Sequence, residues 1–159
     1  MYHFTESGLT NAWLANGYKV KHTSYGEAMA IDDIDGLHLA IAQNLIEKKG
    51  SLTGKEFGFL RTLMGMSKIG LAGMLGVQEQ SVSLWERTGK VPKAQDALHR
   101  LIANERLVKG SVGIAEVIER INVVGHLVNR PIVVKERGHK WTARSSTKPE
   151  NATGAWYEP

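Results

Sequence analysis

Residues 66–92, MSKIGLAGMLGVQEQSVSLWERTGKVP, predict two short helices that meet at a tight angle. Ser67 is placed to cap the first helix through its hydroxyl oxygen. Gly76 is placed to end it, because glycine readily takes the left-handed conformation found at helix C-termini, and Val77 then turns back into the core. Apolar residues at helical spacing form the inner side of the pair: Leu71, Ala72, Leu75, Val82 and Trp85. This pattern predicts a helix-turn-helix.

The segment resembles the helix-turn-helix of the Xre/phage-repressor family, in which Thr/Ser-Gln, Leu-Ala, Leu-Gly-Val and Ser-x-Trp-Glu are followed by Gly and Pro. The matching residues are Ser67, Leu71, Ala72, Leu75, Gly76, Val77, Val82, Ser83, Trp85, Glu86, Gly89 and Pro92. The chain departs from the family at Lys68, where glutamine is usual. Gly70 and Gly73 also depart, and each costs a helix about 1 kcal/mol relative to alanine. The alternative is an ordinary helical hairpin without a role in DNA binding.

Flanking residues extend the motif to a five-helix repressor-like domain over residues 51–125. Thr53 and Glu56 form a capping-box pattern that opens a helix before the motif. Beyond the motif, apolar periodicity predicts a fourth helix over residues 94–106 and a fifth from residue 111 to about residue 125. The family resemblance further implies a structural ion pair between Arg61 and Glu86.

The N-terminal residues 1–50 predict a small α+β unit. Asn16-Gly17 is a strong signal for a type I′ hairpin turn, with strands on either side and a third strand at residues 28–31. A helix is expected over residues 36–49. The acidic residues before it, at positions 32, 33 and 35, suit the positive end of a helix dipole better than a calcium loop, whose other ligands are lacking.

The C-terminal residues 126–159 predict one short strand at residues 132–134 and then a basic, mobile tail. Its composition, with Lys135, Arg137, Lys140 and Arg144 among Ser, Thr, Asn, Gly and Pro, is typical of a flexible arm. Three interpretations of Trp141 and Trp156 stay open: docking on a partner subunit, stacking on nucleic acid, or incidental aromatics in a loosely ordered tail. The fold class expected for the whole chain is therefore mainly α, with a small N-terminal β-hairpin or meander and a C-terminal extension.

Charge is distributed unevenly along the chain. The net charge is −2 over residues 1–50, +4 over residues 51–110 and +2 over residues 111–159. The positive excess around the helix-turn-helix suits binding to phosphates. Cysteine is absent, which excludes disulfides and thiolate zinc sites, and no apolar run approaches the ~20 residues of a membrane span, so a cytoplasmic protein is expected.

Enzymatic function is not expected. The six histidines show no metal-binding spacing, and neither a glycine-rich phosphate loop nor a nucleophile elbow is present. We therefore expect no catalytic residues, no metal and no cofactor.

The leading hypothesis is a sequence-specific transcriptional regulator, most simply a repressor that binds operator DNA as a homodimer. In the docking mode of the family, the second motif helix enters the major groove. Residues expected to contact bases are Gln78, Glu79, Gln80 and Ser83. Residues expected to contact phosphates are Ser67, Lys68, Thr88, Lys90 and Lys93.

Two alternatives stay open. The order of a small β unit before an Xre-type domain resembles the plan of MqsA-type antitoxins, which implies a protein toxin as partner and autoregulation of the operon. Those proteins hold their N-terminal unit with a cysteine-bound zinc, which this chain lacks the residues to bind. The other alternative is a structural interaction protein that retains the motif without affinity for DNA.

Overall fold

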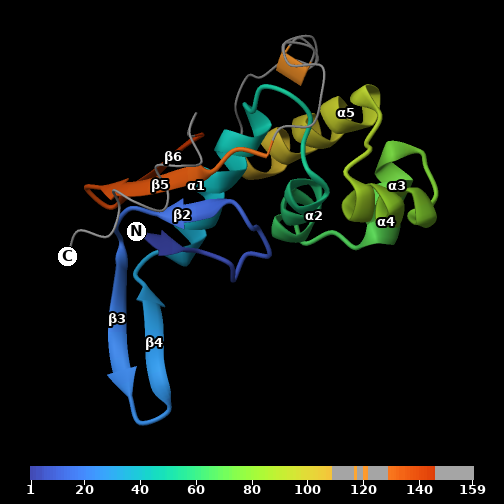
Figure 1. The fold of residues 1–159 in the computed structure, drawn as a ribbon. Coiled ribbons are helices and arrows are strands. Elements are labelled where there is room, and N and C mark those ends of the chain that lie inside the picture. Colours follow the sequence, from blue (N-terminus) through green and yellow to red (C-terminus); the bar gives the residue numbers. More distant parts are fainter. Residues whose placement is uncertain (109–116, 118–119, 122–128, 146–159) are drawn as a thin grey trace.

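The computed structural model describes residues 1–108, 117, 120–121 and 129–145 of the 159-residue chain. Within these residues, strands gather at one end of the molecule and most of the helices at the other (Figure 1). The strands are β1 (Tyr2–His3), β2 (Ala12–Leu14), β3 (Tyr18–Thr23), β4 (Gly26–Ile31), β5 (Ile132–Arg137) and β6 (Lys140–Ser145). The helices are α1 (Ile34–Ile46), α2 (Gly54–Leu63), α3 (Lys68–Leu75), α4 (Glu79–Thr88) and α5 (Lys93–Ala103), which continues as a short π-helix, η1 (Asn104–Val108).

A mixed four-stranded sheet makes the protein α/β rather than mainly α, so the predicted fold class was wrong in this respect. The strand order is β1-β2-β5-β6, in which β2 and β5 run parallel and the outer pairs antiparallel. Residues 135–145, which the sequence predicts to belong to a mobile tail, instead complete β5 and form β6. Trp141 anchors this hairpin, since its side chain is buried against α1. The rest of the predicted tail, residues 146–159, lies outside the described residues.

Asn16 and Gly17 do not form the predicted hairpin turn. β2 pairs with β1 and β5, whereas β3 pairs with β4, so the chain leaves one sheet at this point and enters another. Asn16 has a negative φ and its side chain is bonded across the sheet instead: its amide nitrogen donates to the Glu136 carbonyl and its amide oxygen accepts from the Glu136 amide (3.1 and 2.7 Å). A tertiary contact replaces the local turn that Asn-Gly favours.

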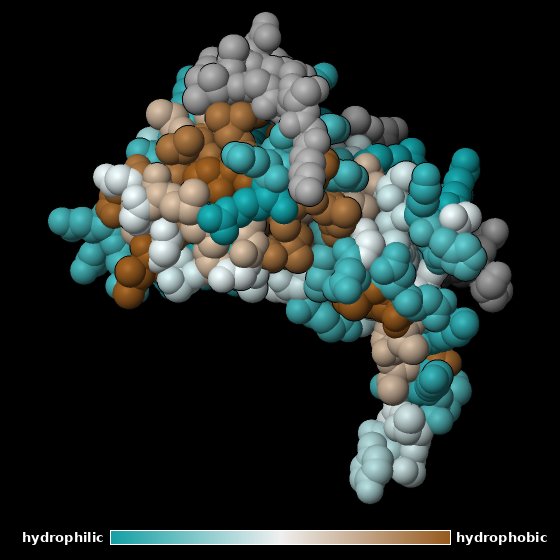
Figure 2. Space-filling view, turned by 180° about the vertical axis from the view of Figure 1, so that it is seen from behind, coloured by the Kyte–Doolittle hydropathy of each residue, from teal (hydrophilic) through white to brown (hydrophobic). Residues whose placement is uncertain are grey.

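The β3–β4 hairpin stands clear of the body as an arm (Figures 1 and 2). Its strands pair in register from Tyr18 with Ile31 to Thr23 with Gly26, and the tip residue Tyr25 is fully exposed. The strand predicted at residues 28–31 is thus present as part of β4. A two-stranded ribbon of this kind is only marginally stable when it packs on nothing else.

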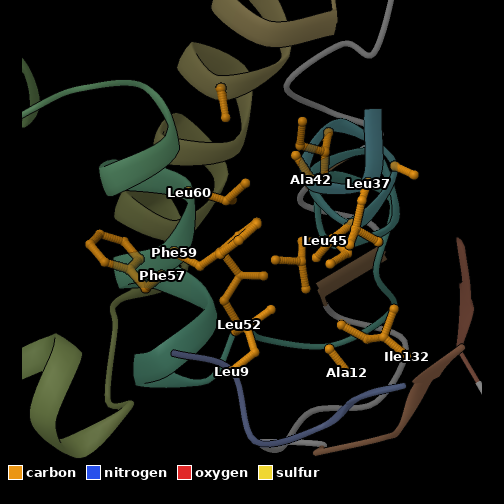
Figure 3. Packing of buried hydrophobic residues seen from close by; sticks show 14 of the residues in the cluster. Leu9, Ala12, Leu37, Ala42, Leu45, Leu52, Phe57, Phe59, Leu60 and Ile132 are labelled. Atoms are coloured by element: carbon orange, nitrogen blue, oxygen red, sulfur yellow. The ribbon is translucent and has the colours of Figure 1, made fainter. Parts of the chain in front are cut away.

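One hydrophobic core connects the N-terminal unit to the helices that follow it. Side chains of α1 meet side chains of α2 across Leu52, and β2 and β5 close the cluster from below (Figure 3). The labelled members of this cluster are Leu9, Ala12, Leu37, Ala42, Leu45, Leu52, Phe57, Phe59, Leu60 and Ile132. The packing therefore continues across residue 50, where the sequence suggests a boundary.

Buried charges fix the linker between α1 and α2. Arg100 of α5, which has no exposed surface, donates to the Asp96 carboxylate at 2.7 Å. Its remaining donors reach the Lys48 and Gly50 carbonyls (2.7 and 2.6 Å), while Asp96 accepts from the Leu52 amide at 3.0 Å. Every charge in this group has hydrogen-bonding partners, as buried charges require. Arg100 thus holds the carbonyl groups of the linker, and Asp96 holds one of its amide groups.

Helices α2 to α5 supply four helices of the predicted five-helix domain. The predicted fifth helix, at residues 111–125, lies mostly outside the described residues; Val117, Arg120 and Ile121 are described and are helical. Val117 and Ile121 pack with Ala97 of α5. Among the described helices, none has both the length and the apolar character needed to cross a membrane.

Candidate nucleic-acid interface

The helix-turn-helix is formed by α3 and α4. The Ser67 hydroxyl accepts from the Gly70 amide (2.9 Å), and Gly76 ends α3 with a φ of 69°, as the sequence predicts. Val77 follows and packs against the core. The residues predicted to face inward, Leu71, Ala72, Leu75, Val82 and Trp85, are all buried. The angle between the helices is thus set by a glycine turn and a shared apolar side.

α4 lies closely against α2. A Cβ atom at Gly54 would come within 2.1 Å of the Glu86 carbonyl oxygen, so only glycine permits this approach. The Trp85 ring meets the Phe57 ring edge to face at 6.1 Å between centroids. The Thr53/Glu56 capping box starts α2 at this point, as predicted. Because two rigid elements meet without a gap, α4 has little freedom to rotate on the domain.

The two residues for which the resemblance implies an ion pair do pair. Arg61 donates through Nε to Glu86 Oε1 at 2.5 Å and through a second nitrogen to Glu86 Oε2 at 3.3 Å. Its third nitrogen donates to the Met66 carbonyl at 2.9 Å. Both side chains are only about 15% exposed. The guanidinium therefore joins α2, the start of α3 and α4 through one planar group.

The candidate base-reading residues lie at the start of α4 and along its outer side. Gln78, Glu79 and Gln80 are exposed, and Ser83 is partly exposed. Gln78 occupies the N-cap position, but its side chain makes no capping hydrogen bond, so its amide group is not used within the helix terminus. Glu79, Gln80 and Ser83 line an open hollow on this side of α4. Short polar side chains at a helix N-terminus are suited to contacts with base edges.

This surface also contains two residues that the sequence did not lead us to predict. They are Leu84 and Arg87, which line the same hollow, and Leu84 is 45% exposed. The signal for them was present, because Leu84 lies four residues after Gln80 and Arg87 four after Ser83, which places each pair on one helix face. Arg87 adds a planar cation, and Leu84 an apolar group, to a side that otherwise carries the Glu79 carboxylate, the Gln80 amide and the Ser83 hydroxyl.

The candidate phosphate contacts flank α4 at the start of α3 and around the start of α5. Ser67 accepts one bond as a cap and keeps its hydroxyl hydrogen for another partner. Lys68 is half-buried, with its ammonium 4.0 Å from Glu86 Oε2. Lys90 and Lys93 are exposed after the end of α4.

Thr88 is differently placed from the other candidates. Its hydroxyl donates to the Leu84 carbonyl at 2.8 Å and accepts from the Lys90 amide at 3.3 Å. To donate to a phosphate it would have to release the Leu84 carbonyl. Thr88 therefore lies near the other candidate phosphate contacts, but its hydroxyl hydrogen is already donated to the Leu84 carbonyl.

Within the residues that the structure describes, no three His, Asp or Glu side chains converge to hold a metal ion. Of the acidic residues around the start of α1, Asp33 caps the helix by accepting from the Gly36 amide at 3.0 Å, and Asp35 lies in its first turn. Comparisons of the chain with protein-family models, curated proteins and solved structures found no match.

Proposed function

We propose that this protein is a sequence-specific DNA-binding regulator that inserts α4 into the major groove of operator DNA. The observation that carries the proposal is the contrast between the two sides of α4. Val82 and Trp85 hold the inner side in the core, whereas Gln78, Glu79 and Gln80 lie exposed at its N-terminal end. A rigid helix with free amide and carboxylate groups at its N-terminus can present a fixed pattern of donors and acceptors to base edges.

Gln80 is the best candidate for a bidentate contact with adenine, and Glu79 can accept from the amino group of cytosine. Lys68, Lys90 and Lys93 would position the helix on phosphates, with Ser67 as a hydroxyl donor. A single helix reads too few bases for useful specificity. We therefore include in the proposal a homodimer that spans two half-sites about one helical turn apart.

The first test is fluorescence anisotropy with the upstream region of the gene and with a shuffled duplex of equal length. We expect tighter binding to the upstream region. Gln80→Ala should remove about 1–3 kcal/mol of this discrimination, the range for one bidentate base contact. Gln43→Ala is the matched control, because Gln43 is an exposed glutamine on α1. Unchanged discrimination in Gln80→Ala would refute the base-reading assignment.

The variant Lys90→Gln tests the contacts to phosphates separately from the contacts to bases. It should weaken binding to both duplexes alike and flatten the slope of log affinity against log salt concentration by about one unit. Lys68 is less suitable for this test, since its removal also takes a cation away from Glu86.

The second candidate function is that of an antitoxin. The β3–β4 arm favours it, because the arm projects from the body and exposes Val20 and Tyr25, as a protein-binding element would (Figure 2). A toxin-sized reading frame beside the gene, and loss of the co-purified toxin when the arm is shortened, would support this function. DNA binding would then serve autoregulation.

A further inference from the structure

The outer face of the four-stranded sheet carries a dense group of cations. Strand geometry alternates side chains between the two faces, so every second residue of β5 and β6 lies on the same side. The inner side holds Ile132, Val134 and Trp141, which are buried toward α1. The opposite side carries Lys135 and Arg137 from β5 and Lys140, Thr142 and Arg144 from β6, all of them exposed, whereas Val133 on the same side is buried.

The register places these cations on one face, with one pair of them directly opposite each other. Arg137 is paired with Lys140, Lys135 with Thr142, and Val133 with Arg144. All four basic residues are exposed, and none lies within 4.0 Å of a carboxylate among the residues that the structure describes. Unpaired like charges this close repel one another, so the arrangement costs free energy unless an anion neutralises it.

The chemistry of this face favours the sugar-phosphate backbone of a nucleic acid over a protein interface or a membrane surface. The large hydrophobic side chains that the structure exposes lie on the arm, α1, α3 and α4, and not on the outer face of β5 and β6. A protein interface would need an apolar centre depleted of charge, and a membrane-binding surface would need apolar groups to insert. Arginine and lysine with a hydroxyl residue between them are the common phosphate contacts of DNA-binding proteins.

We propose that Lys135, Arg137, Lys140 and Arg144 form a second DNA-binding surface, which holds phosphates of duplex DNA without reading sequence. The β5–β6 hairpin lies at the opposite end of the molecule from α3 and α4 (Figure 1), so the two surfaces engage different stretches of backbone. The proposal shares its partner with the proposed function but rests on different residues.

The experiment compares double variants that each remove two positive charges. Arg137→Gln/Lys140→Gln and Lys135→Gln/Arg144→Gln act on the sheet. Lys19→Gln/Lys21→Gln is the control, since both lysines are exposed on a strand of the arm. Binding to a random-sequence duplex and to the upstream region is followed by anisotropy across a salt series.

Each sheet variant should flatten the slope of log affinity against log salt concentration by about two units, and weaken binding to both duplexes roughly tenfold at low salt. The control should leave the slope within about half a unit of the wild type. The charge-keeping variant Arg137→Lys/Lys140→Arg should retain the wild-type slope, which separates loss of charge from loss of folding. Circular dichroism checks the strand content of every variant.

Equal slopes in the sheet variants and the control would overturn the proposal. So would loss of binding to phosphatidylserine vesicles with unchanged binding to DNA, which would assign the face to a membrane surface. A failure of the α4 assignment is distinguishable, because Gln80→Ala tests discrimination between duplexes, whereas the sheet variants act on all duplexes alike.

Discussion

Burial keeps the imidazole of His99 neutral. The residue lies on α5 with no exposed surface, its ring stacks on Phe57 at 4.0 Å between centroids, and its Nε2 lies 3.0 Å from the Phe57 carbonyl oxygen. Desolvation lowers the pKa of His99 to about 4, the Phe57 carbonyl opposes this shift, and the positive charges of Arg100 and Arg61 add to it. The Nε2–H tautomer, which can donate to that carbonyl, suits the site best.

This lowered pKa predicts a loss of stability in acid. The unfolded chain takes up the proton near pH 6.5 and the folded chain only near pH 4, so the contribution of His99 is complete above pH 6.5 and is lost as the pH falls toward 4. The loss is about 3 kcal/mol, from ~1.4 kcal/mol per pKa unit. Urea unfolding of wild type and His99→Gln at pH 7 and pH 4 measures it. The wild type should lose about 3 kcal/mol more than the variant; parallel losses would contradict the prediction.

Arg61 predicts a second effect on stability. Arg61→Ala should lower the free energy of unfolding by about 3 kcal/mol, because Glu86 then stays largely buried with only the ammonium of Lys68, at 4.0 Å, near it. Arg61→Lys should cost less, since it keeps the charge but loses the bidentate geometry and the bond to Met66. Urea unfolding at pH 7 gives both values. Equal losses for the two variants would contradict this prediction, because they would show that the positive charge alone contributes nothing without the planar geometry.

At the scale of elements, α3 is the weakest helix of the motif by composition. Gly73 is exposed, its φ is not positive, and a Cβ atom there would meet nothing within 4 Å. Gly73→Ala should therefore raise stability by about 1 kcal/mol. Gly76→Ala is the contrasting variant and should lower it, because the φ of Gly76 is 69°. Thermal unfolding measures the stability of both variants. A lower stability of Gly73→Ala would contradict the prediction and show that this glycine is needed for a reason other than backbone freedom.

Elements defined by local signals were predictable from the sequence. The caps at Ser67 and Gly76, the capping box at Thr53 and the buried Val82 and Trp85 depend on residues a few positions apart, and the structure contains all of them. Their signals are strong because a helix satisfies its hydrogen bonds within itself.

The sheet was not predictable in the same way. The sequence predicts only residues 132–134 of β5 as a strand. Residues 135–145 read as a polar, basic tail because one face of the hairpin carries the cations and its apolar residues are few. The pairing of β2 with β5 joins segments from opposite ends of the chain, and no local periodicity records such a partner. The Asn16-Gly17 turn failed for the same reason, since a bond to Glu136 outweighed a local preference.

At the scale of the whole molecule, the N-terminal unit and the helix-turn-helix act as one body. The core passes from α1 to α2, and Arg100 and Asp96 bind the linker between them. A displacement caused by a partner bound at the sheet end would thus reach α4 through packed elements rather than through a flexible connection. The two proposed DNA surfaces are accordingly fixed relative to each other.

The parallel pairing of β2 with β5 also orders events during synthesis of the protein. Residues 12–14 leave the ribosome long before their neighbour in the sheet, residues 132–134. Until then one edge of β2 is open, and Ala12 and Leu14 lack the cover that they have in the finished protein. A message cut short after the helix-turn-helix would yield chains with this apolar edge permanently bare, which are natural substrates for chaperones and proteases.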